Sequence, residues 1–224
     1  MRFSEKYRPQ TLDEVVGQPF VRMFKALAAN PYSCCILLEC QHGGVGKTST
    51  ALAFANDVGC PDEMHGLHIV PCSEFSIEVA REMFDGNRLR LRPMMGKGGW
   101  HCVILEEFDW LPAQTQRYLK VALETRLPSR CIVVATSNGT GKLDRALLQR
   151  FHHYAFSYGA PFRDACIQRL RHIWKLETGS EEMPEYLIGL GDTAEQSFSL
   201  RVALDKMQDM IACEQYRQQE LAVA

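Results

Sequence analysis

A glycine-rich stretch that ends in lysine and threonine is the part of this sequence with the clearest chemical potential. Its members are Gly43, Gly44, Val45, Gly46, Lys47, Thr48 and Ser49. Successive backbone N–H groups of such a loop, together with the positive end of a following helix, form a concave site for a polyphosphate. The Lys47 ammonium would reach the outer phosphates, and the Thr48 hydroxyl would ligate Mg²⁺. The strict phosphate-loop pattern has glycine where this chain has Gln41.

Two neighbouring carboxylates later in the chain would complete a phosphate-transfer site. The apolar run Trp100 to Leu105 ends at Glu106 and Glu107. In such sites one carboxylate holds Mg²⁺ through its waters, and the next orients and activates the attacking water. We assign Glu106 to the metal and Glu107 to the water. Asn138 follows a second apolar run, Cys131 to Thr136, where an amide can hold an attacking water or contact a γ-phosphate, although an asparagine at the end of a strand more often forms a turn.

The segments around these residues alternate between apolar runs and helical patterns. An apolar run from Cys34 predicts a strand before the loop, and the spacing of apolar residues predicts a helix from Lys47 to Val58. The two apolar runs named above predict strands, Leu67 to Pro71 predicts another, and helices are expected at Phe20 to Ala29, Ile77 to Phe84 and Gln114 to Glu124. This alternation predicts an α/β core.

Three residues are candidate helix caps. Thr11 is expected to cap a short helix that contains Asp13 and Glu14, and Ser73 or Ser76 the helix that begins at Ile77.

Composition limits the remaining possibilities. The chain has 224 residues, 46% of them hydrophobic, and a formal net charge of -2. This suits an ordinary globular chain with one sizeable α/β core and a small second domain. No apolar run approaches the ~18 residues of a membrane span, and the first residues lack the apolar core of a signal peptide, so we expect a cytoplasmic protein without membrane contact. Any contact with nucleic acid must come from a local basic patch.

The most basic stretch lies between residues 87 and 99 and contains no acidic residue. Together with the helix before it, this stretch offers these candidates for contacting DNA phosphates: Arg81, Arg88, Arg90, Arg92 and Lys97. A solvated loop explains the same residues equally well.

The chain has nine cysteines, an odd number, and they include no C-x-x-C pair. Most lie in apolar runs, where a free cysteine behaves as a small hydrophobic residue, so we interpret them as reduced. A two-Cys, two-His zinc site would need Cys60, His65, His68 and Cys72. Structural thiols and surface histidines are the better interpretation of these four residues.

The segment Glu5 to Gln18, placed ahead of the phosphate loop, resembles the N-terminal signature of the AAA+ clamp-loader ATPases, which include the small subunits of replication factor C and their phage and bacterial relatives. In that family this segment folds over the adenine. The resemblance therefore implies adenine contacts by Tyr7, Arg8, Pro9 and Val16, with ATP and Mg²⁺ as cofactors.

The same resemblance implies further roles. Asn138 matches the sensor-1 position, and Arg201 matches sensor 2, where an arginine contacts the γ-phosphate. Arg150 matches the arginine finger that reaches a neighbouring subunit, with Arg145 as the alternative. The helix at Ile77 to Phe84 corresponds to one that follows the backbone of primed DNA. With Lys47 and Glu107, the residues Asn138, Arg150 and Arg201 complete the expected catalytic set.

The resemblance also predicts two domains. Residues 1–157 would form the AAA+ core, a parallel sheet flanked by helices, and residues 158–224 a small helical lid. Within the lid, apolar spacing predicts helices at Pro161 to Lys175, Met183 to Leu190 and Ser199 to Gln219. The family usually has a third, helical collar domain that holds its ring together, and we expect this chain to lack it.

The predicted function is ATP hydrolysis at the interfaces of a homo- or hetero-oligomer that acts on primed DNA in replication, with a sliding clamp as a candidate partner. Two alternatives stay open. One is a collarless helicase loader, or a recombination or transposition regulator, that coats DNA as an ATP-dependent filament. The other is a nucleotide-binding scaffold that does not hydrolyse ATP and lends Arg150 to an active partner.

Overall fold

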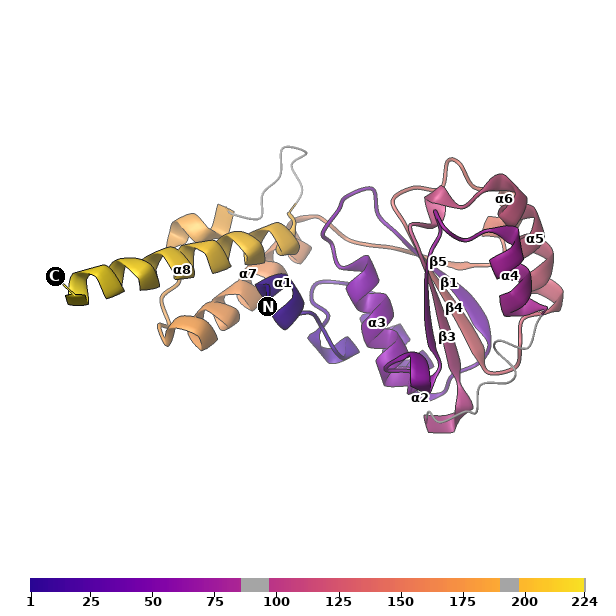
Figure 1. Ribbon diagram of the computed structural model, residues 1–224, viewed down its shortest axis with the longest axis horizontal. Helices are drawn as coiled ribbons and strands as arrows, with labels where there is room; N and C mark the ends of the chain where they lie inside the picture. Colours follow the sequence, from indigo (N-terminus) through magenta and orange to yellow (C-terminus); the bar gives the residue numbers. More distant parts are fainter. Residues whose placement is uncertain (86–96, 190–197, 224) are drawn as a thin grey trace.

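The centre of the molecule is a parallel sheet of five strands in the order β2-β3-β4-β1-β5. The computed structural model describes residues 1–85, 97–189 and 198–223 (Figure 1). The strands are β1 Cys34–Glu39, β2 Leu67–Pro71, β3 His101–Glu106, β4 Cys131–Ser137 and β5 His152–Ala155. Because parallel strands need crossover connections, helices cover both faces of this sheet, and all strands end at the same edge.

The central strands are buried on both faces, which explains why their sequences are almost continuously apolar. In β1, Ile36 and Leu38 contribute to one core cluster, while Leu37 points to the cluster on the opposite face. The register pairs Val134 of β4 with Ile36 of β1 and with Ile104 of β3. Apolar side chains of these three neighbouring strands therefore point to the same face of the sheet.

Helices lie on both sides of the sheet (Figure 1). One face carries α2 Val21–Ala29 and α3 Lys47–Val58, whose Phe24 and Phe54 rings are in contact with centroids 5.3 Å apart. The other face carries α4 Ile77–Phe84, α5 Ala113–Thr125 and α6 Arg145–Leu148. Four short 3-10 turns join these elements, namely η1 Leu12–Glu14, η2 Glu63–His65, η3 Lys97–Gly99 and η4 Phe108–Trp110.

The C-terminal part is helical and lies beyond α3, away from the sheet (Figure 1). It contains α7 Ala160–Thr178, η5 Glu185–Gly189 and α8 Leu200–Val223, and the N-terminal helix α1 Phe3–Lys6 lies against α8. Phe162 and Leu170 of α7 and Met207 of α8 belong to the same core cluster as Phe54 of α3. The apolar core therefore continues from the sheet into these helices.

Most expected elements are present, with a few differences. The structure adds the edge strand β5, which the sequence did not reveal because its residues are largely exposed. The region Met183 to Leu190 forms only the short turn η5 in its described part, rather than a full helix. The described residues include no helix long and apolar enough to cross a membrane.

All three cap assignments can be decided, because Ser76 and not Ser73 is the residue that precedes α4. Ser76 is the cap of α4, since its hydroxyl oxygen accepts a hydrogen bond from the N–H of Val79 at 3.4 Å. Thr11 occupies the predicted N-cap position of η1, but its side chain makes no capping hydrogen bond to the backbone. Asp57 instead accepts a bond from the N–H of Leu12 at 3.0 Å.

Candidate active site

The glycine-rich loop joins the end of β1 to the start of α3, as the sequence predicted. Its backbone is left-handed at Gly44 (φ 74°) and Gly46 (φ 97°), a conformation that favours glycine. A Cβ atom at Gly43 or Gly46 would meet no protein atom within 4 Å, so both positions border open space. This geometry leaves a cradle at the N-terminal end of α3 that suits an anion.

Lys47 lies at the mouth of this cradle. Its Nζ donates hydrogen bonds to the carbonyl oxygens of Cys40 at 2.8 Å and His42 at 3.1 Å. Burial lowers the pKa of Lys47 below its ordinary value, because desolvation disfavours the charged form. The ammonium is thus held by loop carbonyls within reach of the open space.

A cavity of about 220 Å³ lies over the loop, at the edge where β3 and β4 end. Five of the predicted catalytic or metal-binding residues line it, namely Lys47, Thr48, Glu107, Asn138 and Arg201. They come from three places far apart in the sequence: the loop, the ends of two neighbouring strands, and the first turn of α8. The structure therefore brings two cationic side chains, a hydroxyl, a carboxylate and an amide together around one cavity.

Glu107 occupies an unusual backbone conformation at this edge. Its φ of 54° and ψ of 53° are left-handed, which is uncommon for a residue with a side chain and recurs at functional sites. The neighbouring Phe108 is fully buried, and the N–H of Glu107 donates to Thr136 Oγ1 at 3.4 Å. Glu106, the predicted metal ligand, ends β3 and is not among the residues that line the cavity.

Asp109 is a polar residue of this site that the sequence analysis missed. Its Oδ1 accepts hydrogen bonds from the hydroxyl of Ser137 at 3.1 Å and from the N–H of Asn138 at 3.0 Å. The available signal was its position two residues after Glu107 within the same turn. Nothing in the sequence showed that this turn lies beside the end of β4.

A second cavity, of about 310 Å³, adjoins the first and shares Gly44, Val45, Gly46, Ser49 and Arg201 with it. Its wall includes all four residues predicted to contact adenine, Tyr7, Arg8, Pro9 and Val16. The opposite wall comes from α7 and α8 through Phe162, Leu200 and Leu204. The cavity is thus a partly apolar space beside a phosphate cradle.

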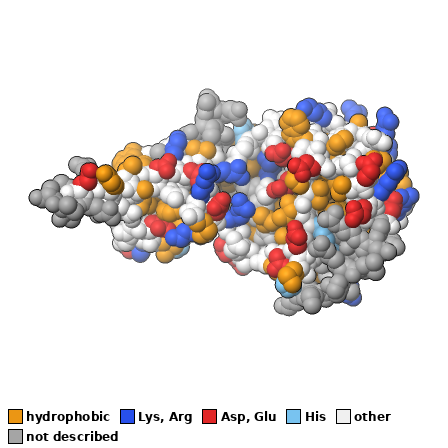
Figure 2. Space-filling model, in the orientation of Figure 1, with side chains coloured by type: hydrophobic (Ala, Val, Ile, Leu, Met, Phe, Trp, Pro, Cys, Tyr) orange, Lys and Arg blue, Asp and Glu red, His pale blue; other side chains and the backbone are white. Residues whose placement is uncertain are grey.

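This second cavity lies between the core and the C-terminal helices. Figure 2 shows Lys and Arg side chains near the narrowing between the two parts of the molecule. The arginines that line the cavity are Arg2, Arg8 and Arg201. The acidic residues Glu5 and Asp205 line it too, so the charged lining residues leave a small net positive charge, which favours an anionic ligand.

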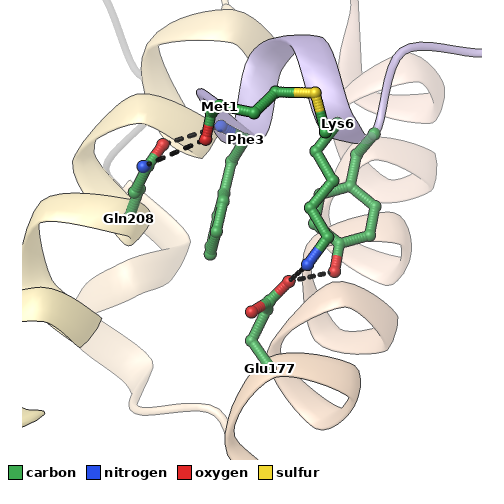
Figure 3. Close-up of polar contacts among 6 residues, drawn as sticks. Met1, Phe3, Lys6, Glu177 and Gln208 are labelled. Carbon is green, nitrogen blue, oxygen red and sulfur yellow. Dashed lines mark hydrogen bonds and ion pairs between the residues drawn. The ribbon is translucent and has the colours of Figure 1, made fainter.

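The N-terminal wall of the cavity is fastened to the C-terminal helices (Figure 3). The N–H of Phe3 donates to Gln208 Oε1 at 2.7 Å, and Ser4 Oγ donates to Asp205 Oδ1 at 2.7 Å. Lys6 and Tyr7 both donate to Glu177 at the end of α7. These bonds lower the pKa of Glu177, with the bond from Lys6 as the largest cause.

Arg150 lies outside both cavities, immediately after α6. Its Nη2 forms an ion pair with Glu124 Oε2 at 2.5 Å, and its buried Nε has no hydrogen-bond partner. Arg145, the alternative, is exposed at the start of α6. Within a single chain, neither arginine lines the first cavity, the one over the glycine-rich loop, which we call the phosphate cavity.

The predicted DNA contacts can be placed only in part. Arg81 is exposed on α4. Arg88, Arg90 and Arg92 lie outside the described residues, and so does the side chain of Lys97, whose backbone begins η3.

The four residues of the candidate zinc site are separated. Cys60 and Cys72 belong to core clusters on opposite faces of the sheet. His65 pairs with Asp62, and the buried His68 contacts His101 with 3.2 Å between Nε2 and Nδ1. The described part of the chain contains no group of three or more His, Cys, Asp or Glu side chains that could hold a metal ion.

Comparison with solved structures supports the fold. The RuvB Holliday junction branch migration motor of Thermotoga maritima superposes with a TM-score of 0.66 at 17% sequence identity, over 93% of this chain and 67% of that one. A DNA polymerase III γ-subunit-related protein of the same organism gives a TM-score of 0.55 at 16% identity, over 82% of this chain and 69% of that one. These superpositions confirm the expected α/β fold with helices at the C-terminal end.

Sequence relatives agree with the resemblance to clamp loaders. Replication factor C subunit 3 of Blastobotrys adeninivorans is 31% identical over 78% of this chain and 50% of its own length, and the replication factor C small subunit of Methanococcus maripaludis is 31% identical over 68% and 48%. The sliding-clamp-loader large subunit of Escherichia phage RB69 is 25% identical over 75% of this chain and 50% of its own length. The chain thus spans about half the length of these curated relatives.

The family comparison covers the phosphate loop, the acidic turn and the end of β4. Residues 41–158 match the ATPase family associated with various cellular activities (AAA). This match extends over more than half of the 224 residues and includes most of the residues that line the phosphate cavity. The chain belongs to the AAA family of ATPases.

Proposed function

We propose that this protein binds ATP with Mg²⁺ and hydrolyses it as one subunit of a clamp-loader-like assembly on primed DNA. The observation that carries the proposal is the phosphate cavity, where Lys47, Glu107 and Arg201 meet although they lie far apart in the sequence. The adjoining cavity with its N-terminal wall suits the adenosine part of the nucleotide.

The residues of the cradle fit a triphosphate. The open space at Gly43 and Gly46 leaves room for phosphate oxygens close to the backbone. Lys47 would exchange its two loop carbonyls for phosphate oxygens, while Arg201 would contact the γ-phosphate from α8. Glu107 would accept a proton from the attacking water, and the amide of Asn138 would hold that water in line.

The donor set also fits a magnesium ion. The Thr48 hydroxyl and the Glu107 carboxylate line the same cavity, and hard oxygen ligands are those that Mg²⁺ prefers. Thr48 would hold the ion directly, whereas Glu106 ends β3 outside this cavity and would act on the ion only through intervening water. The ion would neutralise charge on the β- and γ-phosphates.

We place the boundary between core and lid at residues 157 and 158. The Gln18 side chain bonds both backbone groups of Ser157, donating to its carbonyl at 3.1 Å and accepting from its N–H at 2.9 Å. The chain then enters α7 with Gly159 at its start. Gln18 would hold the end of the core while the lid turns about the next residues.

Assembly would complete the site. Arg150 lies on the surface of one chain but outside its cavities, as a residue should that acts on a neighbouring subunit. In the assembly it would leave Glu124 and stabilise charge on the transferred phosphoryl group. Arg81 on α4 and the basic stretch after it would contact the DNA backbone, and the names of the relatives suggest a sliding clamp as partner.

A second candidate is a nucleotide-binding scaffold that does not hydrolyse ATP. It is favoured by Glu106, which does not line the phosphate cavity although this position should hold the metal. Glu107 and Lys47 are both in place, which favours the active enzyme.

Steady-state ATPase assays with and without primer-template DNA test the proposal. We expect DNA to raise the rate, Lys47→Ala to abolish nucleotide binding, and Arg150→Ala to lower kcat by about a thousandfold, as for other arginine fingers. Arg145→Ala is the matched control on the same segment. Nucleotide binding without hydrolysis under all conditions would establish the scaffold instead, and a loss of activity only in Arg145→Ala would transfer the finger role to that residue.

A further inference from the structure

The turn that carries Glu107 is bonded to the end of β4 by a side chain to which no role has been given. Asp109 Oδ1 accepts two hydrogen bonds from β4 and the residue after it, one from the Ser137 hydroxyl and one from the Asn138 N–H, at 3.1 and 3.0 Å. Asp109 does not line the phosphate cavity, so it acts from behind the residues that do.

On the β4 side, these bonds fix the backbone that presents Asn138. Ser137 is fully buried, and its single O–H proton is shared between Asp109 Oδ1 and the carbonyl oxygen of Gly139, which lies 2.7 Å from Oγ. The same Oγ accepts from the N–H of Gly139 at 3.2 Å. The backbone groups on both sides of the Asn138 side chain are therefore tied to one hydroxyl and one carboxylate. This small network therefore fixes the backbone that carries the Asn138 side chain.

On the β3 side, the same carboxylate fixes the turn of Glu107. The left-handed backbone of Glu107 is unfavourable by itself and persists only where its surroundings enforce it. The buried Phe108 ring, the bond from the N–H of Trp110 to the carbonyl of Glu107 at 2.8 Å and the bonds of Asp109 enforce it here. Asp109 is the member of this set that joins the turn to the neighbouring strand through a charged side chain.

We propose that Asp109 is a positioning residue for ATP hydrolysis, holding the Glu107 carboxylate and the Asn138 amide at a fixed separation across the phosphate cavity. This inference rests on the proposed function, since it concerns the same reaction. Misplacing a group that orients a reactant by about 1 Å can lower a rate a hundredfold without changing how well the substrate binds. Removing the tie should therefore affect kcat more than nucleotide affinity.

Two substitutions of Asp109 distinguish a role of its hydrogen bonds from a role of its charge. Both bonds are accepted by one oxygen, and an asparagine keeps a carbonyl oxygen in that place. Asp109→Asn should retain most of the wild-type kcat, whereas Asp109→Ala should lower it by about tenfold to a hundredfold. If Asp109 acted through its charge, on a metal or on a proton, the two variants would lose activity equally.

The test combines ATPase kinetics with binding of a fluorescent ATP analogue to the full chain. For Asp109→Ala we expect the Kd of the analogue to change less than about threefold while kcat falls. Glu182→Ala is the control, because Glu182 is exposed beyond the end of α7 and lines neither cavity. Urea unfolding of each variant ensures that every rate is measured on folded protein.

Amide hydrogen exchange at Asn138 provides a readout that does not depend on activity. Exchange should be faster in Asp109→Ala than in the wild type and Asp109→Asn, because only the alanine lacks an acceptor for this N–H. An active wild type with an equally active Asp109→Ala variant would overturn the positioning role alone. A wild type that binds ATP without hydrolysing it would overturn the proposed function, and the positioning role with it.

Discussion

At the scale of single residues, Gln116 of α5 holds together three segments near the site. Its Nε2 donates to the carbonyl oxygens of Leu111 at 2.9 Å and Lys142 at 3.4 Å, and its Oε1 accepts from the N–H of Asp144 at 2.8 Å. Asp144 in turn caps α6, the helix that precedes Arg150. One buried amide thus connects the acidic turn with the segment of the proposed arginine finger.

Replacing this amide should destabilise the protein. Gln116→Ala would leave three backbone groups without their partner, and buried unsatisfied polar groups cost about 1–3 kcal/mol each. We expect a loss of about 2–3 kcal/mol in the free energy of unfolding, measured by urea denaturation. Gln114→Ala, an exposed glutamine on the same helix, should change this free energy by less than about 0.5 kcal/mol. Equal effects of the two substitutions would contradict the role of Gln116.

Sequence reasoning identified residues whose type and local spacing show their chemistry, and missed those whose role comes from a distant neighbour. Lys47 and Glu107 lie in recognisable patterns, and the structure places both at one cavity. Gln116 and Asp109 look like ordinary polar residues in the sequence. Their partners are up to 29 positions away, and only the folded chain brings them together.

At the scale of elements, too, local sequence patterns predicted some features, while features that depend on distant contacts were missed. The central strands were predicted because burial on both faces requires apolar runs. Among the described strands, the edge strand β5 pairs with β1 alone. It consists of His152, His153, Tyr154 and Ala155, so it has no apolar run. Helix α1 was missed because four residues are too few for a helical pattern. Its stability comes from α7 and α8.

The bonds between α1 and α7 should make stability depend on pH. Hydrogen bonds from Lys6 and Tyr7 lower the pKa of Glu177 below its ordinary value of 4.5. A carboxyl group with a lowered folded-state pKa contributes stability above its unfolded-state pKa and loses it as the pH falls through the folded-state value. Glu177→Gln should therefore cost up to about 1 kcal/mol at pH 7 and progressively less below about pH 4.5.

Urea unfolding of the wild type and of Glu177→Gln, from pH 7 to below pH 4.5, measures the difference in their free energies of unfolding. Glu182→Gln, an exposed substitution shortly after α7, serves as the control and should show no such dependence. If the difference in unfolding free energy between the wild type and Glu177→Gln stayed constant down to pH 3.5, the bonds from α1 would not depend on the charge of Glu177.

At the scale of the whole molecule, the phosphate loop touches the C-terminal helices directly. A Cβ atom at Gly44 would lie 2.0 Å from Ser199 Oγ, immediately before α8. Ser199 is buried, and its hydroxyl oxygen accepts from the N–H of Val202 in the first turn of α8 at 3.4 Å. The start of the helix that carries Arg201 therefore rests on the loop, with no space between them for a side chain.

Gly44→Ala should push the phosphate loop away from the start of α8. The methyl group would collide with Ser199, and the φ of 74° would be strained for alanine, so we expect a loss of about 1–3 kcal/mol in unfolding free energy together with weaker ATP binding. Gly43→Ala is the matched control for stability, because its Cβ would meet no protein atom within 4 Å. Adding Ser199→Gly to Gly44→Ala should recover part of the loss. If Gly44→Ala unfolded like Gly43→Ala, the close contact would have no energetic role.

The bonds of the N-terminal segment to α8 also have a consequence for biosynthesis. Phe3 bonds Gln208, and these residues are 205 positions apart. On the ribosome, the chain will have made the sheet and the phosphate loop long before it makes the residues of α8 that line the second cavity. A nascent chain can therefore fold its core early, but it cannot hold a nucleotide between both walls until α8 has emerged, so completion of this pocket would report that synthesis has passed residue 208.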